Sequence, residues 1–416
     1  MKSVTRPALA ALAIAALALT ACSSKASQSE TTTDNGVKTG AGISGGHIKL
    51  GMITDLSGAF AAIGKELSQS AKVYWDQVND KGGVCGKFPV DIDVQDSGYD
   101  VQNTVSLYKQ MSPNVLGFPN ILGSAHTLAL NDSLKADSML VVTHGQGTEL
   151  LGYPNIITTG ATFDIEGANG LGYLYEQGKI KDGDTIGSLH LEGTYGDAVL
   201  AGIKSFASAH DMKVVDTQIG STDSDMSSAV TDMASKHISA LVFSGTPPQL
   251  ASAAGATATA GLDIPILAST PSWASALLDT PAAPVLKKNV TVVFPTDTFE
   301  TPQATDFRNA YLKAYPNQNP SLQILLEYSE NQAFDDILEK ACADGDLTRE
   351  GVMAAKDAIG TVTEDGITPP LDFSNPAKPA TAAEFVTSVS ADTPGGLKLV
   401  KGPYTSDEGQ ALWDSK

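Results

Sequence analysis

Short apolar runs alternate with helix-like patterns along most of this chain, and the alternation limits the folds open to it. A first series of runs is IKLGMIT (48–54), FPVDIDV (88–94), VLGF (115–118) and MLVVT (139–143). After NIITTG (155–160), a second series is TIGSLHL (185–191), KVVDTQI (213–219), ISALVF (238–243), IPILAS (264–269) and VTVVFP (290–295). Strands that alternate with helices form parallel sheets covered by helices on both faces. The sequence therefore predicts an α/β protein with two doubly wound parallel-sheet lobes.

Helical patterns dominate after residue 300 and belong to neither series, so we expect them to return to the first lobe. Lobe 1 is predicted at 47–160 plus 297–370, and lobe 2 at 161–296 plus 371–410, joined by several hinge crossings. Ligands of open α/β sheets bind outside the carboxyl ends of the strands. Two facing lobes would therefore share one ligand cleft that closes like a hinge.

The N-terminus has the pattern of an export signal. Lys2 and Arg6 precede an apolar stretch, 8–19, that is well short of the ~20 residues of a membrane-spanning helix. It ends in LTAC, residues 19–22, which resembles the lipobox of bacterial lipoproteins, whose cysteine is acylated and becomes the mature N-terminus. We expect a signal peptide over 1–21 and a lipidated Cys22 that anchors the protein to the outer face of the cell membrane. A short transmembrane anchor or an ordinary cleaved signal is the alternative.

The segment 22–46 is expected to be a flexible tether. It is rich in Ser, Thr and Gly and has no aromatic residue, so it lacks the apolar surface that ordering requires.

The chain has three cysteines. Lipidation of Cys22 leaves Cys85 and Cys342 in an oxidising compartment, where an even pair suggests a disulfide. Two separate buried thiols are the alternative.

Charge and motifs exclude several functions. The formal net charge is −20, which becomes −22 without Lys2 and Arg6, so nucleic acid is not an expected partner. No phosphate-binding loop, nucleophile elbow or zinc-binding HExxH motif is present, and the six histidines have no ligand-like spacing. We expect no enzymatic activity, no cofactor and no metal. His126 and His144 follow strand ends, where a polar lining of the cleft is preferred over a metal or proton role.

The loops after several strands are rich in Gly, Ser and Thr, which allow close backbone approach and supply hydroxyl donors. They are TDLSGAFAAIG (54–64), ILGSAHT (121–127), THGQGTEL (143–150) and LEGTYGD (191–197). Ser124 stands at a predicted helix start. From the residues alone, a capping role is preferred over anion binding.

The order of these segments along the chain changes the preferred role of Ser124 from helix capping to ligand binding. IKLGMITDLSGAFAAIG, followed by VNDKGGVCGKFPVDIDVQDSGYD, resembles the start of the leucine/isoleucine/valine-binding protein family. GSAHT, THGQGTEL and TYG then match the family's Ser/Thr loop, its S-x-A-x-T-x-x-L segment and its Q-Y-G segment. The similarity runs from about 47 to 375. It implies the type I periplasmic binding protein fold and a substrate-binding protein of an ABC importer.

The resemblance also implies a ligand site. Ser124, with Ala125 beside it, matches the serine that holds the ligand carboxylate, and Gly145, Gln146 and Thr148 match the segment that completes this carboxylate site. Tyr195 matches an aromatic residue of the second lobe that closes over the ligand. Phe60 or Ile63 matches an apolar wall.

The sequence departs from the family pattern where the ligand ammonium is expected to bind. Instead of an acidic residue after IPILAS, the chain has TPSWAS, residues 270–275, with Trp273 as a candidate stacking face or simply packed surface. A buried ammonium without a carboxylate is costly, which puts an α-amino acid ligand in doubt. Glu330 is a substitute only if its helix lines the cleft, and an exposed helix glutamate is the preferred interpretation.

The predicted function is that of a lipid-anchored, monomeric substrate-binding protein of an ABC importer. It is expected to bind a small carboxylate-bearing solute (an amino acid, amide or small organic acid) and to present it to permease subunits. A non-catalytic ligand sensor is the alternative. An exported hydrolase that uses Ser124 with His126 or His144 is a more distant alternative.

Overall fold

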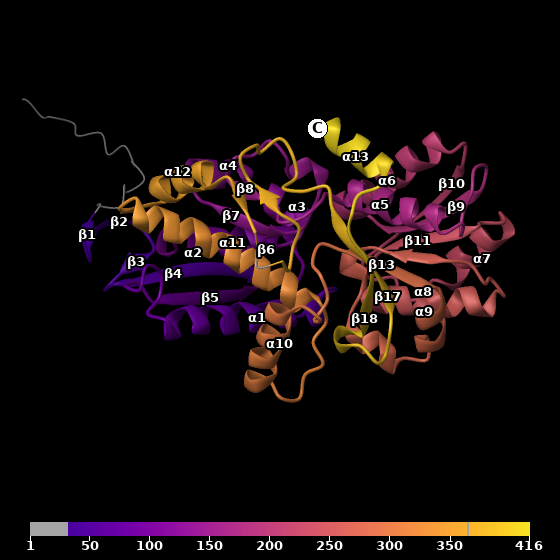
Figure 1. Ribbon diagram of the computed structural model, residues 1–416, viewed down its shortest axis with the longest axis horizontal. Coiled ribbons are helices and arrows are strands. Elements are labelled where there is room, and N and C mark those ends of the chain that lie inside the picture. Colours follow the sequence, from indigo (N-terminus) through magenta and orange to yellow (C-terminus); the bar gives the residue numbers. More distant parts are fainter. Residues whose placement is uncertain (1–31, 364–365) are drawn as a thin grey trace, which may run out of the picture. The chain divides into compact units, whose positions relative to one another are not determined.

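The computed structural model of the protein describes residues 32–363 and 366–416 (Figure 1). The predicted signal peptide, Cys22 and the first part of the predicted tether lie outside the described residues. Within the described part of the chain, no helix combines the length and the apolar character that crossing a membrane requires.

The first sheet has the strand order β3-β4-β6-β7-β8, with β5 paired to β4. All its neighbouring strands are parallel except β3, which is antiparallel to β4. Every residue of β6 and β7 is buried, as expected when helices cover both faces of a sheet. The strands are β3 (Ile43–Ser44), β4 (His47–Thr54), β5 (Val90–Asp96), β6 (Phe118–Leu122), β7 (Val141–His144) and β8 (Ile156–Ile157).

Helices from both ends of the chain belong to this sheet. The orange helix α11 contacts the indigo helix α1 and the strands β6 and β7 (Figure 1). The Trp75 indole Nε1 donates to Asn331 Oδ1 at 2.6 Å, and the Ser70 hydroxyl donates to Ile324 O at 2.7 Å. The helices are α1 (Ala61–Asp80), α2 (Val101–Met111), α3 (Ser124–Leu128), α4 (Asn131–Ala136), α10 (Pro302–Ala314), α11 (Gln323–Ala343) and α12 (Arg349–Ile359).

The second sheet has the order β10-β9-β11-β12-β13-β17-β18. Its first five strands are parallel, whereas β17 and β18 are antiparallel to their neighbours. The strands are β9 (Thr185–Leu191), β10 (Lys213–Ile219), β11 (Ala240–Ser244), β12 (Ile266–Ala268), β13 (Val290–Phe294), β17 (Glu384–Val389) and β18 (Leu397–Tyr404). The helices are α5 (Phe163–Glu176), α6 (Thr194–Ala209), α7 (Ser227–Ser235), α8 (Pro247–Thr259), α9 (Ala283–Asn289) and α13 (Asp407–Asp414).

The chain passes between the two sheets after β8, after β13 and before β17. Two doubly wound lobes with several crossings are therefore confirmed, while the exact lobe boundaries stay predictions. A small hairpin joins β15 (Thr361–Val362) to β16 (Leu371–Asp372). Single 3₁₀ turns are η1 (Ser112–Asn114), η2 (Thr148–Leu150), η3 (Thr270–Ser272), η4 (Ser275–Asp279) and η5 (Pro394–Gly396).

The predicted tether is wrong from residue 32 onward. The segment forms β1 (Thr32–Asp34) and β2 (Val37–Thr39), and β2 pairs in parallel with β14 (Asp346–Leu347). Val37 is 4% exposed, and the Lys38 ammonium lies 2.9 Å from an Asp346 carboxylate oxygen. Composition alone could not predict that this segment is ordered, because its partner strand lies some 300 residues further along the chain.

A disulfide joins Cys85 to Cys342, with the Cα atoms 6.4 Å apart. It connects the turn after α1 to the end of α11, two elements that are 257 residues apart in sequence. Cys85 N also donates to a Glu339 carboxylate oxygen at 2.7 Å. The cross-link therefore fixes the returning helix to the first lobe.

Candidate ligand-binding cavity

One cavity is lined by residues that follow strands of both sheets. It lies where the family resemblance placed a ligand. None of its thirteen lining residues is Asp, Glu, Lys or Arg. They are Phe60, Ile63, Tyr99, Leu122, Gly123, Ser124, His144, Gly145, Gln146, Phe163, Tyr195, Thr270 and Pro271. The cavity is therefore mostly apolar, with polar groups concentrated around Ser124 and Gln146.

Ser124 is the first residue of α3, directly after the strand β6. The residue before it, Gly123, has a φ of 104°, a conformation that glycine adopts without strain. The Ser124 hydroxyl oxygen accepts a hydrogen bond from Gly147 N at 3.0 Å and makes no helix cap. The capping interpretation is thus wrong. Since the oxygen acts as an acceptor for Gly147, its own hydrogen is available for another acceptor.

Gly145 and Gln146 complete this polar edge. A Cβ atom on Gly145 would lie 2.7 Å from Ser124 N and 2.8 Å from its hydroxyl oxygen, so the close approach of the two loops requires glycine. The Gln146 side chain is buried, and its Nε2 has no hydrogen-bond partner among the described residues. Its backbone oxygen accepts from Phe163 N at 2.9 Å, which joins this loop to the start of α5. A buried amide donor without a partner is costly unless a ligand accepts from it.

Aromatic pairs form the apolar walls. The Phe60 and Tyr99 ring centroids are 4.6 Å apart on the side of the first sheet, and those of Phe163 and Tyr195 are 4.8 Å apart on the side of the second. The Tyr195 hydroxyl lies 3.2 Å from Ser272 Oγ, which is directed into the second lobe. The walls therefore offer ring faces rather than charges.

Three predicted site residues do not line the cavity. The Thr148 hydroxyl donates to an Asp164 carboxylate oxygen at 3.1 Å, and Ala125 lies behind Ser124 in α3. Trp273 is fully buried and donates from Nε1 to Gly395 O at 3.1 Å, so it is a core residue and not a stacking face. Pro271 contributes to the cavity from the same segment.

The two histidines differ in role. His144 lines the cavity, and its Nδ1 lies 2.9 Å from a carboxylate oxygen of Glu330. Burial lowers the pKa of His144 to about 4, so its ring is neutral at pH 7. His126 lies behind the wall, 2.8 Å from the Thr104 hydroxyl, with its ring 4.6 Å from that of Tyr99. Neither ring has a hydrogen bond to Ser124 within the described residues, so the arrangement that the hydrolase alternative needs is not formed.

Glu330 is fully buried and does not line the cavity. It lies behind His144, so the expectation of an exposed helix glutamate is wrong. No other carboxylate takes the place of the family's ammonium partner in the cavity lining.

Sequence reasoning missed Tyr99 and Phe163 as lining residues. Tyr99 follows the end of β5, at the same sheet edge as Ser124, so the rule that ligands bind at carboxyl strand ends identifies it. Phe163 begins α5 and has no comparable signal, because its position depends on the Gln146 backbone contact.

Comparison with known proteins agrees with this geometry. Residues 47–394 match the family described as periplasmic binding protein. A fatty acid ABC transporter substrate-binding protein from Thermomonospora curvata is 34% identical, covers 92% of this chain and 98% of its own, and superposes with a TM-score of 0.89. A Leu/Ile/Val-binding protein, BraC3, from Rhizobium johnstonii is 25% identical over 206 residues, which span 49% of this chain and 55% of that relative.

A branched-chain amino acid ABC transporter protein from Thermus thermophilus with bound valine shares the fold, with a TM-score of 0.78 at 14% identity over 88% of this chain and 99% of its own. The family match covers most of the chain. The protein therefore belongs to the periplasmic binding protein family, whose members bind solutes and catalyse no reaction.

Proposed function

We propose that the protein is the extracytoplasmic substrate-binding component of an ABC importer. In this proposal it binds one small monocarboxylate with an apolar body and presents it to permease subunits. The observation that carries the proposal is the cavity itself, in which apolar walls surround the Ser124 hydroxyl and the Gln146 amide. The name of the Thermomonospora curvata relative, at 34% identity over nearly its whole length, supports an acid with an alkyl chain.

The polar edge suits a carboxylate. The Ser124 hydroxyl hydrogen and the unpartnered Gln146 Nε2 both come from loops at the end of the first sheet. Hydrogen bonds from neutral donors to an ionised acceptor are worth about 1.5–3 kcal/mol each. Thr148 is not among these donors, because its hydroxyl donates to Asp164.

The absence of a carboxylate from the lining argues against an α-amino acid. The ammonium of such a ligand would enter an apolar environment without an ionic partner, which costs several kcal/mol. Phe60, Ile63 and Phe163 are instead suited to an alkyl chain. A short or branched fatty acid satisfies both the polar edge and these walls.

The proposal also includes a monomeric state and an anchor at the outer face of the membrane through Cys22. The anchor rests on the lipobox-like LTAC segment. A ligand sensor with the same cavity is the second candidate, and neighbouring genes for permeases and ATPases would favour the importer.

Calorimetric titration of the purified protein with hexanoate, isovalerate, leucine and valine tests the ligand class. We expect one of the acids to bind with a 1:1 stoichiometry and both amino acids to bind at least 100-fold more weakly. Leucine binding as tightly as isovalerate would disprove the monocarboxylate proposal, and binding by none of the four would remove its support.

A further inference from the structure

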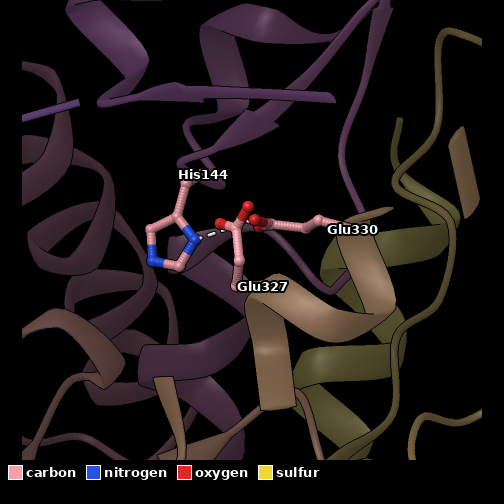
Figure 2. Close-up of side chains that lie close together, drawn as sticks. All are labelled: His144, Glu327 and Glu330. Atoms are coloured by element: carbon pink, nitrogen blue, oxygen red, sulfur yellow. Dashed lines mark hydrogen bonds and ion pairs between the residues drawn. The ribbon is translucent and has the colours of Figure 1, made fainter. Parts of the chain in front are cut away.

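A second polar cluster lies behind the ligand cavity, between α11 and the first sheet. Glu327 and Glu330, three residues apart on one face of α11, approach His144 at the end of β7 (Figure 2). One nitrogen or oxygen atom from each of the three side chains lies within 4.8 Å of the other two. We propose that this cluster binds a divalent first-row transition metal ion, such as Zn²⁺.

The cluster is isolated from solvent. Glu327 and Glu330 are 0% exposed. Among the described residues, neither carboxylate has an ion pair with Lys or Arg. Two buried carboxyl groups beside one imidazole need positive charge, either as protons or as a cation.

The surrounding amides favour the ionised form of Glu327. Asn120 Nδ2 donates to one of its carboxylate oxygens and Asn331 Nδ2 to the other, each at 2.6 Å. A carboxylate that accepts hydrogen bonds at both oxygens is stabilised in its charged form.

Two side chains at the cluster also carry acceptor oxygens without a hydrogen-bond partner in the described part of the chain. Glu330 Oε1 and Asn120 Oδ1 are fully buried and have no partner among the described residues. A single proton satisfies only one acceptor, but a cation coordinates several at once.

The ligand set is one imidazole nitrogen and two carboxylates, with a fourth position open to water. Zn²⁺ accepts nitrogen and oxygen ligands in a four-coordinate site, and two carboxylates neutralise its charge. His144 also lines the ligand cavity, so the cluster adjoins it. The inference does not rest on the identity of the solute, because neither glutamate lines the cavity.

The test is metal binding by the full-length chain after treatment with a chelator. Equilibrium dialysis against Zn²⁺ should yield one bound equivalent, and Glu327→Gln and Glu330→Gln should each weaken binding roughly 100-fold or more. Zn²⁺ at 100 times its dissociation constant should raise the Tm of the wild type by roughly 5 °C. Mg²⁺ at the same concentration should have no such effect.

The matched control is Glu408→Gln. Glu408 and Asp182 form ion pairs with His210 in a separate, partly exposed cluster that is a plausible adventitious Zn²⁺ site. We expect Glu408→Gln to leave the high-affinity equivalent unchanged. Equal loss in this control, or equal binding in all variants, overturns the proposal.

Folding of the variants is checked by circular dichroism without metal. If a glutamine variant does not fold, the absorption spectrum of the Co²⁺-substituted wild type decides. Intense visible bands of four-coordinate cobalt support the site, and their absence overturns it. No bound Zn²⁺, combined with a stable Glu327→Gln/Glu330→Gln double variant, would mean that protons occupy the cluster.

Discussion

The Ser124 hydroxyl oxygen accepts the Gly147 N–H at 3.0 Å, so the loop after β7 fixes the hydroxyl at the start of α3. This contact lies between two neighbouring strand ends of the first sheet. It leaves the hydroxyl hydrogen as a donor on the cavity side.

Ser124→Ala removes this donor and leaves Gly147 N without its acceptor. We expect the affinity for the carboxylate ligand to fall about 10- to 100-fold and the stability to fall by about 1–3 kcal/mol. Titration calorimetry and urea unfolding measure the two effects separately. An unchanged dissociation constant would show that the carboxylate binds elsewhere.

Gln146→Leu should affect ligand affinity and protein stability differently: the affinity should fall, whereas the stability should not. The wild type keeps a buried amide nitrogen without a partner, so replacing it by an apolar group should leave the ligand-free protein equally stable or stabilise it by about 1 kcal/mol. The same change should weaken ligand binding at least 10-fold. A destabilised variant with wild-type affinity contradicts both parts.

Gly145→Ala tests the close approach of the two loops. The added methyl group would collide with Ser124, and we expect a loss of stability of about 1–3 kcal/mol together with loss of ligand binding. Gly255→Ala is the control: a Cβ atom there, in α8, meets nothing within 4 Å, and it should stabilise by about 0.5–1 kcal/mol. Thermal unfolding of both variants distinguishes a specific collision from a general effect of alanine.

His126 should make the protein acid-sensitive. Burial lowers its folded-state pKa from 6.5 to about 4. The unfolded state therefore binds the proton more readily, and the stabilising contribution present above pH 6.5 is lost as the pH falls through about 4. Between pH 7 and pH 4, the wild type should lose about 3 kcal/mol more than His126→Gln. Parallel stability curves for the two proteins would argue against a neutral buried imidazole.

The Cys85–Cys342 disulfide closes a long loop and should contribute substantially to stability. Its reduction, or Cys85→Ser/Cys342→Ser, is expected to cost about 2–5 kcal/mol, because the cross-link restricts the unfolded chain. The double variant should no longer respond to reductant. If its Tm equals that of the oxidised wild type, the bridge has no stabilising role.

Much of the fold was predictable because it rests on local patterns. Apolar runs such as 139–143 correspond to buried strands, and the return of α11 followed from helices that lacked strands of their own. The strand β2 was not predictable, because it depends on pairing with β14 near the other end of the sequence.

The candidate site likewise contains residues that were predictable from the sequence and residues that were not. Ser124, Gly145 and Gln146 lie in loops directly after strands and line the cavity, and it was the family resemblance, not the local pattern, that singled them out. Thr148 and Trp273 were misassigned because their side chains turn towards Asp164 and Gly395, contacts that only the packed structure determines. His144 lines the cavity as expected, but its contact with Glu330 was not predictable, because Glu330 comes from a helix 186 residues away.

The antiparallel pair β17–β18 has a consequence for how the protein reaches its native state. The strand β13 can pair with β17 only after about 90 further residues have been synthesised. The helix α11, which packs on the first sheet, lies between these two strands in the sequence. Neither lobe therefore has all its strands and covering helices until the last part of the chain is present. Such non-local pairing slows folding.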